Sequence, residues 1–112
     1  MIHEGFVHLW QEEKSNWQLV WTCLRNGSIR CQVDPRSKSN VILEVEITGG
    51  LRIAEAARRR ANSFQIRDAA GKTIMAAPTR DDMAEWIMQI KKHKMHLRRW
   101  ERNDLCMFKC FE

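Results

Sequence analysis

The strongest chemical signal in this 112-residue sequence is a run of three arginines, Arg58, Arg59 and Arg60. They stand in the basic half of the chain, where 14 Lys and Arg face eight Asp and Glu over residues 51–112, against five and six over residues 1–50. A basic half indicates an anionic partner, which could be lipid headgroups, nucleic acid or an acidic protein. A solvated surface that only favours solubility explains the charge asymmetry equally well.

The other residue types that support chemistry do not form a recognisable catalytic or metal site. The four cysteines are Cys23, Cys31, Cys106 and Cys110. They lack the paired spacing and histidine partners of a zinc site. His93 and His96 are three residues apart, but no neighbouring carboxylate completes a metal site, so both are interpreted as surface histidines. The sequence has no glycine-rich phosphate loop and no nucleophile elbow. We therefore expect no enzymatic activity, metal or cofactor.

The sequence lacks a membrane-spanning segment and a secretory signal, and this limits where the protein is expected to act. No apolar run approaches the roughly 20 residues needed to span a bilayer, and the N-terminus does not have the pattern of a secretory signal. A cytoplasmic protein with reduced cysteines is therefore expected. The stretch KKHKMHLRRW could attract nucleic acid electrostatically. It is explained more simply as the basic C-terminal part of a helix, so no nucleic-acid partner is expected.

The elements that must position the basic residues are short strands followed by one helix. Alternating apolar residues and turn signals predict seven strands, at residues 5–10, 17–24, 28–33, 41–47, 51–53, 63–68 and 72–77. The period then changes after Pro78. Thr79 or Asp81 can cap a helix there, and its apolar face consists of Met83, Trp86, Ile87 and Ile90.

The dipeptide Asn26-Gly27 predicts a two-residue hairpin turn, because both residues readily adopt positive φ. In that register Cys23 stands opposite Arg30, on the face away from Cys31, so a disulfide between the two cysteines is not expected. The first strand of the hairpin then has Trp17, Leu19, Trp21 and Cys23 on one face, and Val20, Thr22 and Leu24 on the other.

The C-terminal end is predicted to be an apolar extension, residues 101–112, that follows a domain of residues 1–100. Its large apolar side chains are Leu105, Met107, Phe108 and Phe111. They are too apolar for a free tail. Packing back on the domain is the favoured interpretation, and a subunit contact or the start of another segment are the alternatives.

The order of these elements, together with four local motifs, resembles the pleckstrin homology (PH) domain family. The motifs are Gly5-Phe6-Val7, the run 17–24 with its glycine turn, Ser63-Phe64-Gln65-Ile66, and DDMAEWIMQI, in which Trp86 takes the place of the family's characteristic tryptophan. The resemblance covers about residues 3–94. It implies a mainly β fold: a seven-stranded antiparallel barrel or sandwich with one open corner capped by the C-terminal helix.

The resemblance also implies where phosphoinositides usually bind, and this sequence departs from that pattern. Family members with tight binding carry a lysine late in the first strand and two basic residues early in the second. The corresponding positions here are Leu9 (or Trp10), Gln18 and Val20, none of them basic. Lys14 and Arg30 could contribute, but two scattered cations do not rebuild the pocket. A high-affinity site of the usual kind is therefore not expected.

Some family members instead bind headgroups between the first hairpin loop and the loop joining strands five and six. The residues expected at such a site here are Lys14, Trp17, Arg58, Arg59 and Arg60. Each cation near an anionic leaflet contributes about 1 kcal/mol, so this cluster predicts weak or moderate peripheral binding to anionic lipids, including phosphoinositides. The alternatives are that the arginines are only solvated and that Trp17 belongs to the core. In that case the chain would be a protein-interaction or autoregulatory PH domain, attached for example to a small-GTPase regulator or a kinase, with little lipid binding.

Overall fold

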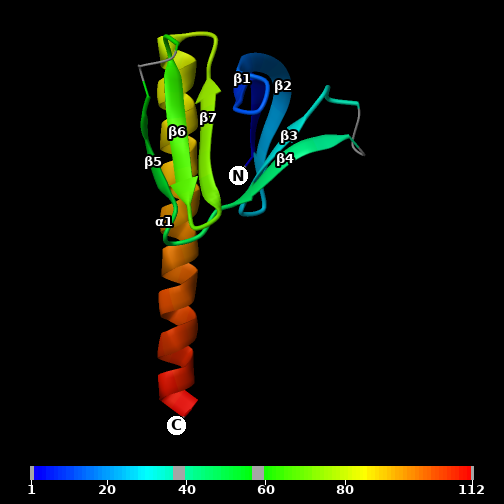
Figure 1. The fold of residues 1–112 in the computed structure, drawn as a ribbon. Helices are drawn as coiled ribbons and strands as arrows, with labels where there is room; N and C mark the ends of the chain where they lie inside the picture. Colours follow the sequence, from blue (N-terminus) through cyan, green and yellow to red (C-terminus); the bar gives the residue numbers. More distant parts are fainter. Residues whose placement is uncertain (1, 37–39, 57–59, 112) are drawn as a thin grey trace.

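The computed structural model describes residues 2–36, 40–56 and 60–111, and the side chains as far as His96. Seven strands precede one helix (Figure 1): β1 (His3–Gln11), β2 (Asn16–Arg25), β3 (Ser28–Gln32), β4 (Val41–Glu46), β5 (Arg52–Glu55), β6 (Ser63–Asp68), β7 (Gly71–Ala76) and α1 (Arg80–Phe111). All pairings are antiparallel, and the strand order is β4-β3-β2-β1-β7-β6-β5. Helix α1 packs along β5 and β6.

The predicted fold class is confirmed, with one refinement of its shape. The strands form a single sheet that is not closed, because β4 and β5 are its two edges. The fifth strand is shifted from the prediction: Leu51 precedes it and is fully buried in the core, while the strand runs from Arg52 to Glu55. Leu51 and Ile53 are both directed inward, but only Ile53 belongs to the strand. The alternation of the two residues therefore predicted their burial and not the start of the strand.

The predicted hairpin between β2 and β3 is confirmed residue by residue. Asn26 and Gly27 have φ of 51° and 77°, as a two-residue turn of this kind requires. The register pairs Cys23 with Arg30, so Cys23 and Cys31 lie on opposite faces and both are free thiols. Cys31 is fully buried, and burial raises its pKa to about 11.

The helix closes the core through Trp86, as its place in the sequence predicted. Its first turn is capped by Thr79, whose Oγ1 accepts a hydrogen bond from the backbone N–H of Asp82 at 3.1 Å. Trp86 is 3% exposed and meets the ring of His3 edge-on, with centroids 4.3 Å apart. A Cβ on Gly5 would lie 3.9 Å from the Trp86 ring, so the start of β1 packs directly on this indole.

The prediction that His93 and His96 both lie on the surface is wrong for His93. His96 is exposed, but His93 is only 9% exposed, and burial lowers its pKa. The physical reason is helical periodicity: position 93 continues the stripe formed by Met83, Trp86 and Ile90, all of them buried.

Helix α1 continues through most of the predicted C-terminal extension and ends at Phe111. Figure 1 shows its second half running on past the end of the sheet. The side chains on which the predictions for this extension rest lie outside the described set: Leu105, Met107, Phe108 and Phe111. The division into residues 1–100 and 101–112 therefore stays a prediction.

Candidate functional site

Trp17 lies on the outer face of the β1–β2 hairpin and is half-buried, so it is not a core residue. The register pairs it with Trp10 across the two strands. Their rings meet at 63° with centroids 5.3 Å apart, which is a favourable edge-on contact. Two indoles thus form an aromatic platform where the hairpin approaches its turn.

Arg60 reaches this platform from the loop between β5 and β6. Its guanidinium carbon lies 5.7 Å from the centroid of the Trp17 ring, within the range of a cation–π interaction. The base of the loop is fixed by Ser63, whose hydroxyl donates to the carbonyl oxygens of Arg60 (2.7 Å) and Ala56. The Ala77 N–H donates to the carbonyl of Asn62 at 2.9 Å and fixes the loop from β7 as well. The loop is therefore held where its described arginine meets Trp17.

His8 is the neighbouring titratable group on the same face. Burial and, to a smaller extent, the positive charge of Arg60 lower its pKa. His8 is consequently neutral at neutral pH, and Arg60 supplies the positive charge at this position.

Lys14 lies exposed in the β1–β2 turn, which is closed by a hydrogen bond from the Ser15 N–H to the Glu12 carbonyl (3.3 Å). The indole N–H of Trp10 donates to the Glu12 carboxylate, so the turn holds an acid beside its lysine. Arg58 and Arg59 lie outside the described residues.

Of the five residues predicted for the site, the structure thus brings Arg60 onto Trp17 and puts Lys14 in the turn that leads into Trp17. The acid of Glu12 was not part of the prediction. Nothing in the linear sequence marks it as a partner of Trp10, because that contact depends on how the turn closes.

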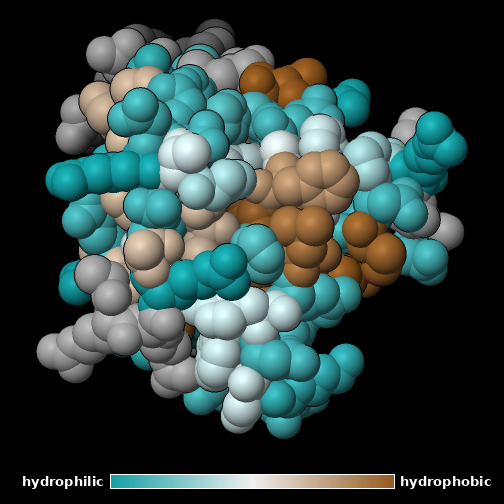
Figure 2. Space-filling view, turned by 90° about the horizontal axis from the view of Figure 1, so that it is seen from above, coloured by the Kyte–Doolittle hydropathy of each residue, from teal (hydrophilic) through white to brown (hydrophobic). Residues whose placement is uncertain are grey.

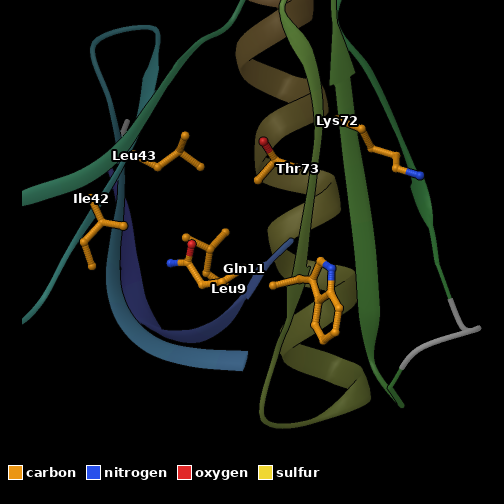
Figure 3. Close-up of a pocket in the computed structure, with 7 residues that line it drawn as sticks. Leu9, Gln11, Ile42, Leu43, Lys72 and Thr73 are labelled. Atoms are coloured by element: carbon orange, nitrogen blue, oxygen red, sulfur yellow. The ribbon is translucent and has the colours of Figure 1, made fainter. Parts of the chain in front are cut away.

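A small cleft of about 160 Å³ lies between β1, β4 and β7, beside the end of β1 at which the resemblance implies the usual phosphoinositide pocket. Its lining is Leu9, Trp10, Gln11, Ile42, Leu43, Lys72 and Thr73. Lys72 is the single cation among these residues, and Figure 3 shows its side chain directed away from the other labelled groups.

The three positions where tight binders carry basic residues have other roles in this fold. Leu9 and Val20 are buried in the core. Gln18 accepts a hydrogen bond from the Gln11 amide at 2.9 Å. Among the described residues, the lining of the cleft thus lacks the cluster of charge that would hold several phosphates.

Sequence reasoning missed that β1 continues the aromatic surface of β2. Phe6 faces Trp21 edge-on with ring centroids 5.0 Å apart, and both stand on the outer face. The alternation of Phe6, His8 and Trp10 in the first strand was the available signal.

The end of the molecule that is seen from above the orientation of Figure 1 carries a patch of hydrophobic side chains with hydrophilic surface around it (Figure 2).

In the described part of the chain, no helix is long and apolar enough to cross a membrane.

Comparison with known proteins gives one family and many structural neighbours. The PH-domain family model matches residues 1–95. No curated protein sequence matches the chain. The C-terminal PH domain of pleckstrin in complex with D-myo-Ins(1,2,3,5,6)P5 is similar, with a TM-score of 0.72 and 19% identity over 84% of this chain and 96% of that chain.

Two further neighbours share the fold. The PH domain of human oxysterol-binding protein-related protein 11 has a TM-score of 0.73 and 16% identity, covering 86% of this chain and 82% of that chain. The Slm1 PH domain in complex with phosphoserine has a TM-score of 0.69 and 11% identity, covering 83% and 94%. At these identities the likeness shows a common fold.

Proposed function

The chain belongs to the PH-domain family, and from this premise we propose that it is a non-enzymatic adaptor module that recruits a larger signalling protein to membranes. It binds the cytoplasmic surface of anionic, phosphoinositide-containing bilayers with weak or moderate affinity. The contact surface consists of Lys14, Trp17 and Arg60, together with Arg58 and Arg59 from the same loop as Arg60.

The observation that carries this proposal is the contact between Arg60 and Trp17. An indole suits the headgroup region of a bilayer, since it offers both an apolar ring and a hydrogen-bond donor. A guanidinium binds phosphate through several donors at once. Held together on one face, the two groups can contact the acyl boundary and a headgroup phosphate at the same time.

The structural neighbours and the charge distribution support the same function. One neighbour is a PH domain in complex with an inositol pentakisphosphate and another a PH domain in complex with phosphoserine, so this fold accommodates phosphorylated ligands. The cleft lined by Leu9 and Gln11 offers one described cation. An affinity set by a few surface cations is therefore expected, at about 1 kcal/mol for each.

Vesicle sedimentation tests the proposal directly. Phosphatidylcholine vesicles are compared with vesicles that also contain phosphatidylserine or a polyphosphoinositide, at one ionic strength. Wild type is expected to bind both anionic compositions and not the neutral one. Arg60→Glu replaces one attraction with a repulsion and should weaken binding about 30-fold.

Arg67→Glu is the matched control. Arg67 is an exposed arginine at the opposite end of β6 from the loop, so the substitution makes the same change in net charge at a different place. Equal losses in the two variants would mean that only net charge matters, and would overturn the site. A sharp preference for one polyphosphoinositide that survives Arg60→Glu would place binding in the other cleft.

A further inference from the structure

A second concave surface lies on the outer face of β2 and β3, further along the strand from Trp17. It is a groove of about 390 Å³, and the residues that matter for its chemistry are Glu4, Trp21, Cys23, Arg25, Arg30 and Gln32. None of them belongs to the lipid-contact surface proposed above. We call it the Trp21 groove.

The strand register explains why these side chains meet in the Trp21 groove. Glu4, Cys23 and Arg30 form one row across β1, β2 and β3. Phe6 and Trp21 form the next row, so an aromatic pair borders a charged row. Aromatic surface beside a guanidinium is the combination that most often dominates the energy of protein interfaces.

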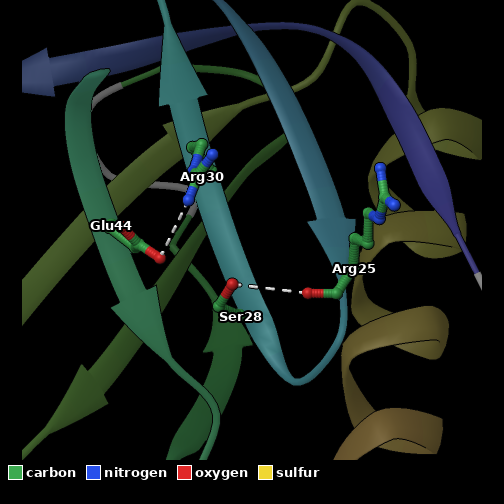
Figure 4. Close-up of polar contacts among 4 residues, drawn as sticks. All are labelled: Arg25, Ser28, Arg30 and Glu44. Atoms are coloured by element: carbon green, nitrogen blue, oxygen red, sulfur yellow. Dashed lines mark hydrogen bonds and ion pairs between the residues drawn. The ribbon is translucent and has the colours of Figure 1, made fainter. Parts of the chain in front are cut away.

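The two arginines of the groove are available to a ligand. Within the described part of the chain, Arg30 forms an ion pair with Glu44 at 3.5 Å (Figure 4). Both side chains of the pair are close to half exposed. A pair of this kind contributes little and can be exchanged for another carboxylate. Arg25 is exposed at the end of β2, and it lines the groove together with Arg30 and Cys23. Burial and the charge of Glu4 raise the pKa of the Cys23 thiol, and the positive charges of the two arginines oppose that shift.

Large apolar side chains are exposed beside the groove. Phe6 is 42% exposed and Leu19 is 52% exposed, and both adjoin Trp21 on the same two strands. An antiparallel strand with one face on the core normally presents polar residues on the other. Here the outer face carries exposed apolar side chains next to its charged ones, which marks an interaction surface.

We propose that the Trp21 groove binds an acidic peptide segment of a protein partner. Apolar side chains of the peptide lie on Phe6, Leu19 and Trp21, and its carboxylates pair with Arg25 and Arg30. Guanidinium groups hold carboxylates in bidentate pairs, which fixes the peptide's position, and the indole and phenyl rings supply the desolvated contact.

The charges around the groove favour a peptide over a membrane. Glu4 lines it, and Glu44 and Glu46 stand on the neighbouring strand opposite Arg30 and Ser28. An anionic leaflet would contact all of these carboxylates together and be repelled by them. A peptide can place its carboxylates at the two arginines alone. The surface at Trp17 and Arg60 therefore suits a membrane, and the Trp21 groove suits a protein.

Selection from a random peptide library displayed on phage, with the whole chain as bait, tests the proposal. The enriched sequences should combine Asp or Glu with Leu, Phe or Trp. A synthetic peptide of the enriched sequence is then titrated by fluorescence anisotropy. The Arg25→Glu/Arg30→Glu double variant and the Leu19→Glu variant should each weaken its binding by at least about tenfold. Arg60→Glu should leave it unchanged. Because Leu19, Arg25 and Arg30 are exposed, melting temperatures should stay close to wild type.

Three results would overturn the proposal. One is enrichment of peptides without acidic residues, and another is equal binding to wild type and the double-arginine variant. The third is loss of binding to anionic vesicles in the double-arginine variant, with Arg60→Glu binding normally, which would make the groove a membrane site. Failure of the vesicle test at Arg60 alone would leave the peptide result standing, so the two proposals are separable.

Discussion

Both faces of the β1–β2 hairpin carry large hydrophobic side chains, yet only the inner face is covered. On the inner face, Val7, Val20 and Leu24 have no exposed surface and pack into the core that Trp86 closes. On the outer face, Phe6 and Leu19 remain 42% and 52% exposed. Burial explains every apolar residue of the inner face, but it does not explain those of the outer face. The inner face accounts for the fold, and the outer face is where partners are to be sought.

The largest effect is expected where the inner face is closed. Trp86→Ala should lower the free energy of unfolding by about 3–5 kcal/mol, because it opens a large cavity beneath His3 and Gly5. Urea unfolding at neutral pH measures this. Met88→Ala is the control on the same helix, where the side chain is 41% exposed, and should change stability by no more than about 0.5 kcal/mol. A Trp86→Ala melting temperature within a degree or two of wild type would contradict the capping role of α1.

A matched pair of leucines on β2 tests the contrast between the faces directly. Leu24 has no exposed surface, and Leu19 is 52% exposed on the opposite face. Leu24→Ala should cost about 2–5 kcal/mol of stability, and Leu19→Ala less than about 0.5 kcal/mol. Peptide binding should show the reverse order among folded variants. Equal destabilisation by the two substitutions would mean that the outer face is packed, and would remove the reason to look for a partner there.

The sequence was sufficient for what depends on local chemistry. The Asn26-Gly27 turn, the period-two alternation and the two cap candidates, Thr79 and Asp81, predicted the hairpin register, the strands and the helix start. Of the two candidates, Thr79 is the residue whose side chain caps the helix. Each of these is determined by neighbouring residues. The same reasoning also found that the usual phosphoinositide positions are not basic, because only residue types are needed for that conclusion.

What the sequence could not supply depends on contacts between distant segments. The meeting of Arg60 with Trp17 joins the β5–β6 loop to strand β2, and no local pattern encodes it. Only the family resemblance gave a reason to expect both residues in one site. The burial of His93 was available from helical periodicity, but a histidine in a basic stretch resembles a surface residue. The exposed aromatic face was also missed. Alternation predicts a strand, but it does not say which of the two faces is buried when both carry apolar or aromatic residues.

Acidification should lower the free energy of unfolding, because His93 is buried in the core. Burial lowers the pKa of His93 below the ordinary histidine value of 6.5, so the unfolded chain takes up a proton more readily than the folded chain. Stability is complete above pH 6.5 and should fall as the pH drops through and below that value. His93→Gln should flatten this dependence when unfolding is measured by urea across the acidic range. Part of the slope should remain, because the pKa of His8 is lowered as well. An unchanged slope in His93→Gln would mean that His93 is solvated and that the apolar stripe ends before it.

The smallest effect on stability is expected for the contact between Arg60 and Trp17 on the outer face. A guanidinium over an exposed or half-exposed indole contributes about 0.5–1 kcal/mol. A double-mutant cycle of Arg60→Ala and Trp17→Ala, measured by urea unfolding, should return a coupling energy of that size. Trp17→Ala also removes the Trp10–Trp17 ring contact. That loss occurs both in the single Trp17→Ala variant and in the double variant, so it cancels in the cycle and only the Arg60–Trp17 coupling remains. The same cycle with Arg67→Ala in place of Arg60→Ala should give a coupling near zero, since Arg67 lies at the far end of β6. Zero coupling at Arg60 would mean that the loop does not hold its arginine on Trp17, and the outer face would then differ from the inner one only in being exposed.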